Sequence, residues 1–107
     1  MIYKFKSKAA GDVIMMGPSG DQVLRLIGKD PAAKGIIEPA AMPQAMAAIE
    51  RAISADEAAR KQAEAEAEAA GEALPPRERV SLRQRAWPLV EMMKRSHAAG
   101  KEIVWGV

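Results

Sequence analysis

Hydrophobic residues near the C-terminal end of the chain repeat first at the spacing of a helix and then at the spacing of a strand. On a helical wheel, one arc about 100° wide contains Leu82, Ala86, Leu89, Val90, Met93 and His97. Ser81 and Gln84 form a capping-box pattern at the start of this helix, and Gly100 can close it. Pro88 lies away from the arc and predicts a kink there. Alternation over residues 103–107 then predicts a terminal strand.

The beginning of the chain predicts a β-hairpin. In residues 2–7, Tyr3 and Phe5 alternate with lysines, which is typical of a half-buried strand. Residues 8–12 have the glycine and the length of a hairpin loop. Residues 12–16 form a short, mainly apolar run. This run fits a second strand, but a helical turn fits nearly as well, and the sequence leaves both open.

A short helix is predicted next. Ser19 and Gln22 repeat the capping-box spacing before the apolar residues 23–27, and Gly28 can close the helix. The glycines before this helix lack the spacing of a phosphate-binding loop, and Pro18 stands where that loop needs a lysine. An ordinary turn that opens a helix is the better interpretation.

Residues 30–42 contain several helix breakers and predict an irregular segment. Ile36 and Ile37 are expected to enter the core there, as a plug or a short extended piece. Pro43 suits the first turn of the next helix. The buried stripe of that helix is expected to contain Met42, Ala45, Met46, Ile49, Ala52 and Ile53.

Residues 55–80 differ from the rest of the chain because alanine and glutamate dominate and large apolar residues are rare. We expect a solvated helical extension that ends near Gly71, supported by pairs such as Glu57–Lys61, and then a linker over residues 72–79. The whole chain of 107 residues predicts a single domain. Its elements in the order β-β-α-α-α-β predict an α+β two-layer sandwich, in which a small antiparallel sheet, made of the N-terminal hairpin and the C-terminal strand, packs on about three helices.

Composition narrows the classes of function. There is no cysteine, which excludes disulfides and thiolate metal sites and favours a reducing, cytoplasmic setting. No signal peptide and no apolar stretch of about 20 residues is present, so no membrane association is expected. We expect no metal and no cofactor, because His97 is the only histidine. The net charge of +2 is uneven, with an excess of bases in residues 4–8 and in residues 79–101.

One basic surface is a candidate for binding. On the helical wheel, Arg83, Trp87 and Lys94 fall together on one flank of the apolar arc. With neighbouring bases added, the candidate binding surface consists of Arg83, Trp87, Lys94, Arg79, Lys4 and Lys6. It could bind nucleic acid or another anion, with the tryptophan stacking on a base. Two alternatives stay open: Arg83 stacks on Trp87 to cover the core edge, or Trp87 and Trp105 line the rim of a homodimer contact.

Catalytic groups are sparse. His97 could act as a general base, but a partly buried position on the apolar arc at the helix end is the favoured interpretation. The glutamates of residues 64–68 are interpreted as a solvated face, because catalytic carboxylates need fixed geometry. Ser7 and Lys8 do not form a nucleophile pair, since adjacent strand residues point to opposite faces. No catalytic residues are therefore assigned, and an enzyme is uncertain and disfavoured.

The sequence resembles a known family. The segments FKSKAAGDVIMMG, QVLRLIGK and KGII near the start, and VSLRQRAWPLVEMMKRSHAAGKEIVWGV at the end, are similar to the domain of unknown function 1840 family. Such proteins are small and bacterial and have no assigned role. The resemblance covers nearly the whole chain except the Ala/Glu-rich segment. It implies the domain limits and a bacterial, cytosolic setting, and it carries no catalytic or ligand-binding residue to this chain.

Two functions from different classes follow from these observations. The leading hypothesis is a small non-enzymatic cytosolic interaction domain with a protein partner, which self-associates as a homo-oligomer. The alternative is a domain that binds nucleic acid or an anionic ligand through the basic flank of the C-terminal helix.

Overall fold

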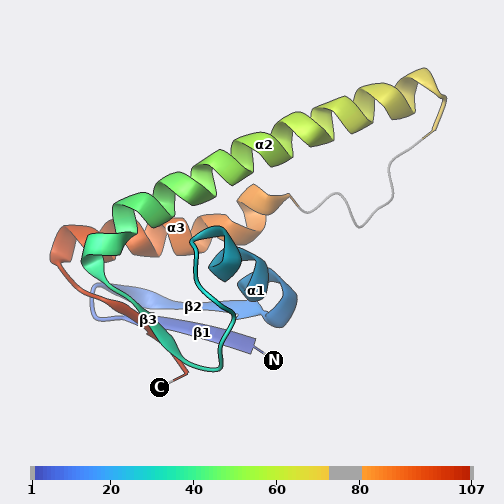
Figure 1. Cartoon of the computed structure of the whole chain (residues 1–107). Coiled ribbons are helices and arrows are strands. Elements are labelled where there is room, and N and C mark those ends of the chain that lie inside the picture. Colours follow the sequence, from blue (N-terminus) through green and yellow to red (C-terminus); the bar gives the residue numbers. More distant parts are fainter. Residues whose placement is uncertain (1, 73–80, 107) are drawn as a thin grey trace.

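Three helices pack on one side of a four-stranded antiparallel sheet in the computed structural model of the protein, which describes residues 2–72 and 81–106 (Figure 1). The elements in chain order are β1 (Ile2–Ser7), β2 (Ala10–Met16), α1 (Gly17–Leu26), β3 (Gly35–Ile37), the 3-10 turn η1 (Pro39–Ala41), α2 (Met42–Ala69), α3 (Leu82–Ala99) and β4 (Ile103–Trp105). The predicted α+β class is confirmed. The sheet contains one strand that the sequence analysis did not predict, β3.

The sheet has the strand order β2-β1-β4-β3, and every neighbouring pair is antiparallel. Residues 12–16 are part of strand β2, so the strand interpretation is confirmed and the helical turn is wrong. The expected loop over residues 8–12 is shorter than predicted, because β2 already begins at Ala10. Ile36 and Ile37 form the short extended piece, and they pair with Val104 and Ile103 of β4. Only Ile37 enters the core; the expectation for Ile36 is wrong, because strand alternation turns its side chain to the other face, where it is 40 % exposed.

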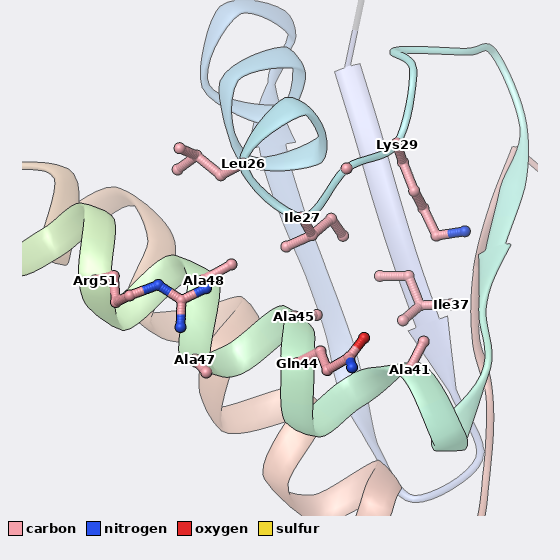
Figure 2. A pocket seen from close by; sticks show the side chains of 11 residues that line it. Leu26, Ile27, Lys29, Ile37, Ala41, Gln44, Ala45, Ala47, Ala48 and Arg51 are labelled. Carbon is pink, nitrogen blue, oxygen red and sulfur yellow. The ribbon is translucent and has the colours of Figure 1, made fainter.

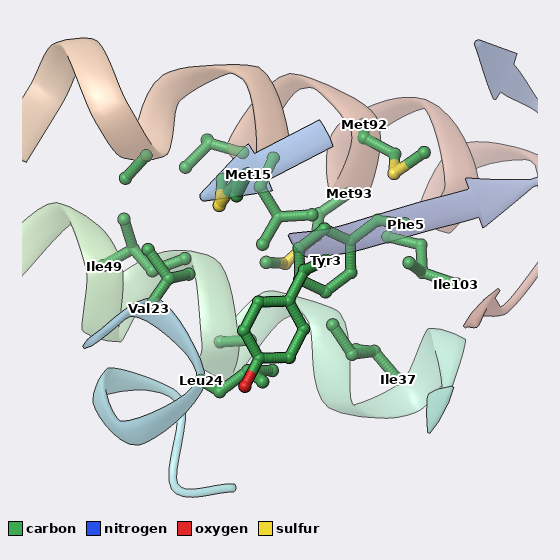
Figure 3. Packing of buried hydrophobic residues seen from close by; sticks show 14 of the residues in the cluster. Tyr3, Phe5, Met15, Val23, Leu24, Ile37, Ile49, Met92, Met93 and Ile103 are labelled. Atoms are coloured by element: carbon green, nitrogen blue, oxygen red, sulfur yellow. The ribbon is translucent and has the colours of Figure 1, made fainter. Parts of the chain in front are cut away.

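The core lies between the helices and the inner face of the sheet (Figure 3). Strand alternation turns Tyr3 and Phe5 toward the helices and Lys4 away from them. The rings of Phe5 and Trp105 meet edge to face, with their centroids 5.7 Å apart. Each fully buried large apolar side chain of this kind contributes about 1.5–3 kcal/mol to folding.

Helix α1 begins earlier than the sequence predicts. It starts at Gly17, with Met16 as the N-cap residue and Pro18 in the first turn, so the predicted cap at Ser19 is wrong. Proline explains the difference, because it sets a helical φ and lacks one of the amide donors that a cap would otherwise satisfy. The helix ends as predicted before Gly28, whose φ of +82° is in the left-handed region.

Helix α2 is one continuous helix of 28 residues. Met42, Ala45, Ile49 and Ile53 are buried on its predicted stripe, while Met46 and Ala52 are half-buried. Most side chains after Ser54 are exposed, and the helix extends beyond the body of the molecule (Figure 1). Of the expected linker, only Glu72 belongs to the described residues.

Helix α3 begins with the predicted capping box, because the Ser81 hydroxyl accepts from the Gln84 amide at 3.2 Å and the Gln84 side chain accepts from the Ser81 amide at 2.9 Å. A side chain of α2 completes this start, since Asp56 Oδ2 accepts from the Leu82 amide at 3.2 Å. Helix α3 continues through Pro88, whose side chain is exposed, and Gly100 closes it with a φ of +66°.

The buried face of α3 differs from the predicted arc at its C-terminal end. Its buried residues are Leu82, Ala86, Leu89, Val90, Met92, Met93 and Ser96. His97 is exposed, so its expected place on the apolar arc is wrong. Ser96 is buried at this end of the helix instead. Its hydroxyl donates to the Ser7 hydroxyl at 2.7 Å, and this hydrogen bond satisfies the buried polar group.

Candidate functional site

Three predicted residues meet on one flank of α3, which we call the α3 basic flank: Arg83, Trp87 and Lys94. The half-buried Trp87 ring lies between the two cations. The Arg83 Cζ atom is 5.5 Å from the ring centroid, and the Lys94 Nζ atom is 4.7 Å from it. Cations at such distances are attracted by the electrons of the ring face. The packing of Arg83 against Trp87 that the sequence analysis left open is therefore present.

Carboxylates also contact both cations of the α3 basic flank. Arg83 Nε lies 2.6 Å from Glu57 Oε1 on α2, and Lys94 Nζ lies 3.6 Å from Glu91 Oε1. The expected pair of Glu57 with Lys61 is replaced by this contact between helices. A hollow of about 270 Å³ beside Trp87 is lined by Glu50 as well as Arg83. The positive potential of the flank is thus reduced by neighbouring acids.

Two other predicted surface residues, Lys4 and Lys6, lie on the sheet and not on α3. Lys4 alternates along β1 with the buried Tyr3 and Phe5, so it lies on the face of the sheet that is turned away from the helices. Lys4 Nζ is 3.6 Å from Asp12 Oδ2 of β2. Arg79 lies outside the described residues. The structure brings Arg83, Trp87 and Lys94 together and places Lys4 on a different side of the molecule.

Trp105 is a core residue. It is 2 % exposed, and its indole nitrogen donates to the Ala32 carbonyl at 2.9 Å. The expectation that Trp105 lines the rim of a homodimer contact is therefore wrong. The alternation of β4 turns this ring inward, where it packs on Phe5 and covers Gly35.

The outer face of the sheet carries an apolar surface that the sequence analysis missed. Its large side chains Ile2, Ile14 and Met16, which we call the outer sheet patch, are 62 %, 64 % and 65 % exposed. They are contiguous, because Ile2 pairs with Met16 across the hairpin and Ile14 is two residues from Met16 on the same face. The sequence pattern that could have revealed this surface is the run Val-Ile-Met-Met. Every position of the run is apolar, so in a strand it places hydrophobic side chains on both faces of the sheet.

A pocket of about 540 Å³, which we call the α1–α2 pocket, lies between the end of α1, strand β3 and the first turns of α2. Figure 2 shows Ile27, Ile37 and Ala45 within it, Lys29 beside Ile37, and Arg51 farther along α2. The full lining consists of Leu26, Ile27, Gly28, Lys29, Ile37, Ala41, Gln44, Ala45, Ala47, Ala48 and Arg51. The lining contains two cations and no carboxylate. No local sequence pattern predicts this pocket, because three separate elements form it.

The groups considered for catalysis do not converge. The Ser7 hydroxyl accepts from Ser96 and from the Ala9 amide at 3.2 Å, so it is held in structural hydrogen bonds. His97 and the glutamates of residues 64–68 are exposed. Over residues 2–72 and 81–106, no three histidine or acidic side chains are grouped closely enough to hold a metal ion.

One buried titratable group is present in the core. The Tyr3 hydroxyl donates to Asp21 Oδ1 of α1, and Tyr3 is 2 % exposed. The hydrogen bond to Asp21 and burial raise the pKa of Tyr3 above its usual value, because ionisation would place a phenolate beside a carboxylate. This hydrogen bond links α1 to β1.

Comparison with known proteins identifies a family but no activity. In the part of the chain that the structure describes, no helix is both long enough and apolar enough to span a lipid bilayer. The comparisons find no matching curated protein and no matching solved structure. The model of the family described as "Domain of unknown function (DUF1840)" matches residues 1–105. Since this match covers nearly the whole chain, the protein belongs to the DUF1840 family.

Proposed function

We propose that this protein is a small, non-enzymatic interaction domain that self-associates through the outer face of its sheet. The observation that carries the proposal is the outer sheet patch, where Ile2, Ile14 and Met16 are each more than 60 % exposed. Contiguous exposed apolar side chains on a sheet face are typical of a surface that another molecule covers. We place the domain in the cytosol as part of the same proposal, which a chain without cysteine supports.

Charge favours a second copy of the chain as the occupant. Lys4 and Asp12 place an ammonium group and a carboxylate beside the outer sheet patch, and both side chains are about half exposed, at 53 % and 45 %. When two copies face each other about a twofold axis, Lys4 can approach the partner's Asp12 in both directions. A surface with both signs of charge is therefore complementary to itself.

The size of the face sets the expected strength. A strand of six residues, such as β1, is about 20 Å long, and four strands are about 15 Å wide. This area is small beside the roughly 800 Å² that each partner buries in a stable complex. We therefore expect a weak dimer that dissociates on dilution.

Sedimentation velocity over a concentration series tests this proposal. The sedimentation coefficient of the wild-type protein should rise with concentration. In the double variant Ile14→Thr with Met16→Thr it should stay at the monomer value, because threonine keeps the strand propensity and removes the apolar contact. Trp87→Ala is the matched control, since it removes a large side chain from the α3 basic flank, and it should still dimerise. A monomer at every concentration, or a dimer lost only in Trp87→Ala, would overturn the proposal.

Nucleic-acid or anion binding through the α3 basic flank is the second candidate. Its support is the half-buried Trp87 between two cations, and it ranks lower because Glu57 and Glu91 contact those cations. It predicts binding to a single-stranded oligonucleotide that weakens steeply with added salt and is reduced in Trp87→Ala. Absent or salt-independent binding would dismiss it.

A further inference from the structure

We propose that the α1–α2 pocket binds a small anion with an apolar body, that is, a molecule with a carboxylate or phosphate group on a short hydrocarbon chain. The pocket lies on the helix side of the sheet, since Ile37, which lines it, belongs to the core. The outer sheet patch lies on the opposite face. The proposal is therefore independent of self-association.

The size and the walls of the pocket suit the hydrocarbon part of such a ligand. Its volume of about 540 Å³ falls in the range of small-molecule sites, which is about 300–1,000 Å³. Ile27 forms an apolar wall, and the fully buried Ile37 lies behind the floor of the pocket. Along α2 the lining side chains are mainly alanines, and their small size leaves the hollow open between the helix and β3 (Figure 2).

The charges of the lining select an anion. Lys29 and Arg51 line the pocket, and neither makes an ion pair with any carboxylate that the structure describes. This differs from Lys4, Arg83 and Lys94, which each contact an acid.

Figure 2 shows how the cationic and the apolar side chains of the pocket are arranged. Lys29 projects beside Ile37 from the loop after α1, whereas Arg51 lies on α2 near Ala47 and Ala48. Ile27 and Gln44 lie between them. An anionic group held at either cation leaves the hydrocarbon chain over the apolar part of the lining.

Octanoate, octyl phosphate and octylamine are suitable probes, because they share one hydrocarbon chain and differ in the head group. We would titrate each into the ¹⁵N-labelled protein and follow the amide signals by NMR. Octanoate, octyl phosphate or both should give saturable shifts at Gly28, Lys29 and the Gln44 side-chain amide. Octylamine should leave these signals in place. Equal shifts with octylamine, shifts confined to the outer sheet patch, or no shifts with either anion would overturn the proposal.

Single-residue variants test which side chains of the pocket hold the anion. Arg51→Gln or Lys29→Gln should weaken binding of the anion by about tenfold or more, because each removes a charge-assisted contact. Lys61→Gln is the matched control, since it removes one exposed charge from α2 outside the pocket. An exposed charge that does not contact the anion contributes little, so the affinity of this variant for the anion should change less than about twofold. Ala48→Leu should fill the pocket and abolish binding while the folded spectrum is retained. Unchanged affinity in both pocket variants would contradict the proposal.

Discussion

At the scale of single residues, two ring systems require glycine as a neighbour. A Cβ atom at Gly35 would lie 2.2 Å from Trp105 Cζ2, and one at Gly20 would lie 2.1 Å from Tyr3 Cδ2. Both rings are buried and cannot move into solvent. The identities of these glycines are therefore set by close packing between elements.

Gly35→Ala should destabilise the protein. The buried indole or strand β3 must shift to admit the methyl group, so we expect a loss of about 1–3 kcal/mol in the free energy of unfolding, measured by urea denaturation. Gly11→Ala is the matched control in a strand, because nothing lies within 4 Å of its added Cβ. Its effect should stay within about 0.5 kcal/mol. Similar losses in both variants would contradict this packing.

Tyr3 should make stability depend on alkaline pH. Its pKa in the folded state is raised above 10.0 by the Asp21 hydrogen bond and by burial. The protonated hydroxyl therefore contributes stability that is fully present below the unfolded-state pKa of about 10 and is lost as the pH rises through the folded-state pKa. Tyr3→Phe should lose stability at neutral pH and show a smaller decrease above pH 10.

Absorbance titration measures the ionisation of Tyr3 directly, because the chain contains one tyrosine. Tyrosinate should form at a higher pH in the folded protein than in urea. A titration at the same pH in both states would show that the Asp21 contact does not persist in solution.

At the scale of elements, α2 and α3 are joined where α3 begins. Asp56 accepts from the Leu82 amide, and the Ser81–Gln84 capping box satisfies further amides of the same turn. Asp56→Ala and Ser81→Ala should each cost about 1 kcal/mol in unfolding free energy, because each leaves an amide of the first turn without its acceptor. Asp56→Asn keeps an acceptor and should cost less. If Asp56→Asn and Asp56→Ala cost the same, the hydrogen bond is not the cause.

The distal part of α2 should contribute helix but little stability. Ala65 is exposed and lies beyond the last buried residue of the helix, Ile53. Ala65→Pro should lower the helical circular dichroism signal while the urea midpoint stays nearly constant, because proline breaks only solvated turns. Ala52→Pro, which interrupts a turn packed on the core, should lower the midpoint strongly. Equal effects would mean that the distal turns are packed on the protein.

The elements that the sequence predicted are those with a local signal. The hairpin, α2 and α3 each have an apolar period or a cap that acts within a few residues. Strand β3 has only three residues, and its strand form depends on pairing with β4, far away in the chain. The cap of α1 was wrong because Pro18 already determines the start of that helix. Ser96 was missed because its partner, Ser7, lies in another element.

At the scale of the whole molecule, the elements formed by residues 2–72 and 81–106 leave one face of the sheet uncovered. The molecule measures 50 × 26 × 22 Å, and the long dimension follows α2, which at 28 residues is about 42 Å long. All three helices occupy the same side (Figure 1). The exposed face therefore carries both the outer sheet patch and the Lys4–Asp12 pair.

The candidate sites could be predicted only in part, because some of them depend on how separate elements pack together. The meeting of Arg83, Trp87 and Lys94 follows from helical spacing within α3, so the sequence was sufficient. The outer sheet patch depends on which face the helices cover, and the α1–α2 pocket depends on how three elements diverge. These are properties of tertiary packing, and no spacing within one segment encodes them.

Self-association through the outer sheet patch is tested most directly by amide NMR spectra recorded at low and high protein concentration. We expect concentration-dependent shifts at Ile2, Ile14, Met16 and neighbouring outer-face amides, with the buried Trp105 indole signal unchanged. Shifts that centre on the Trp87 indole would move the contact to the α3 basic flank. Identical spectra at all concentrations would contradict self-association itself.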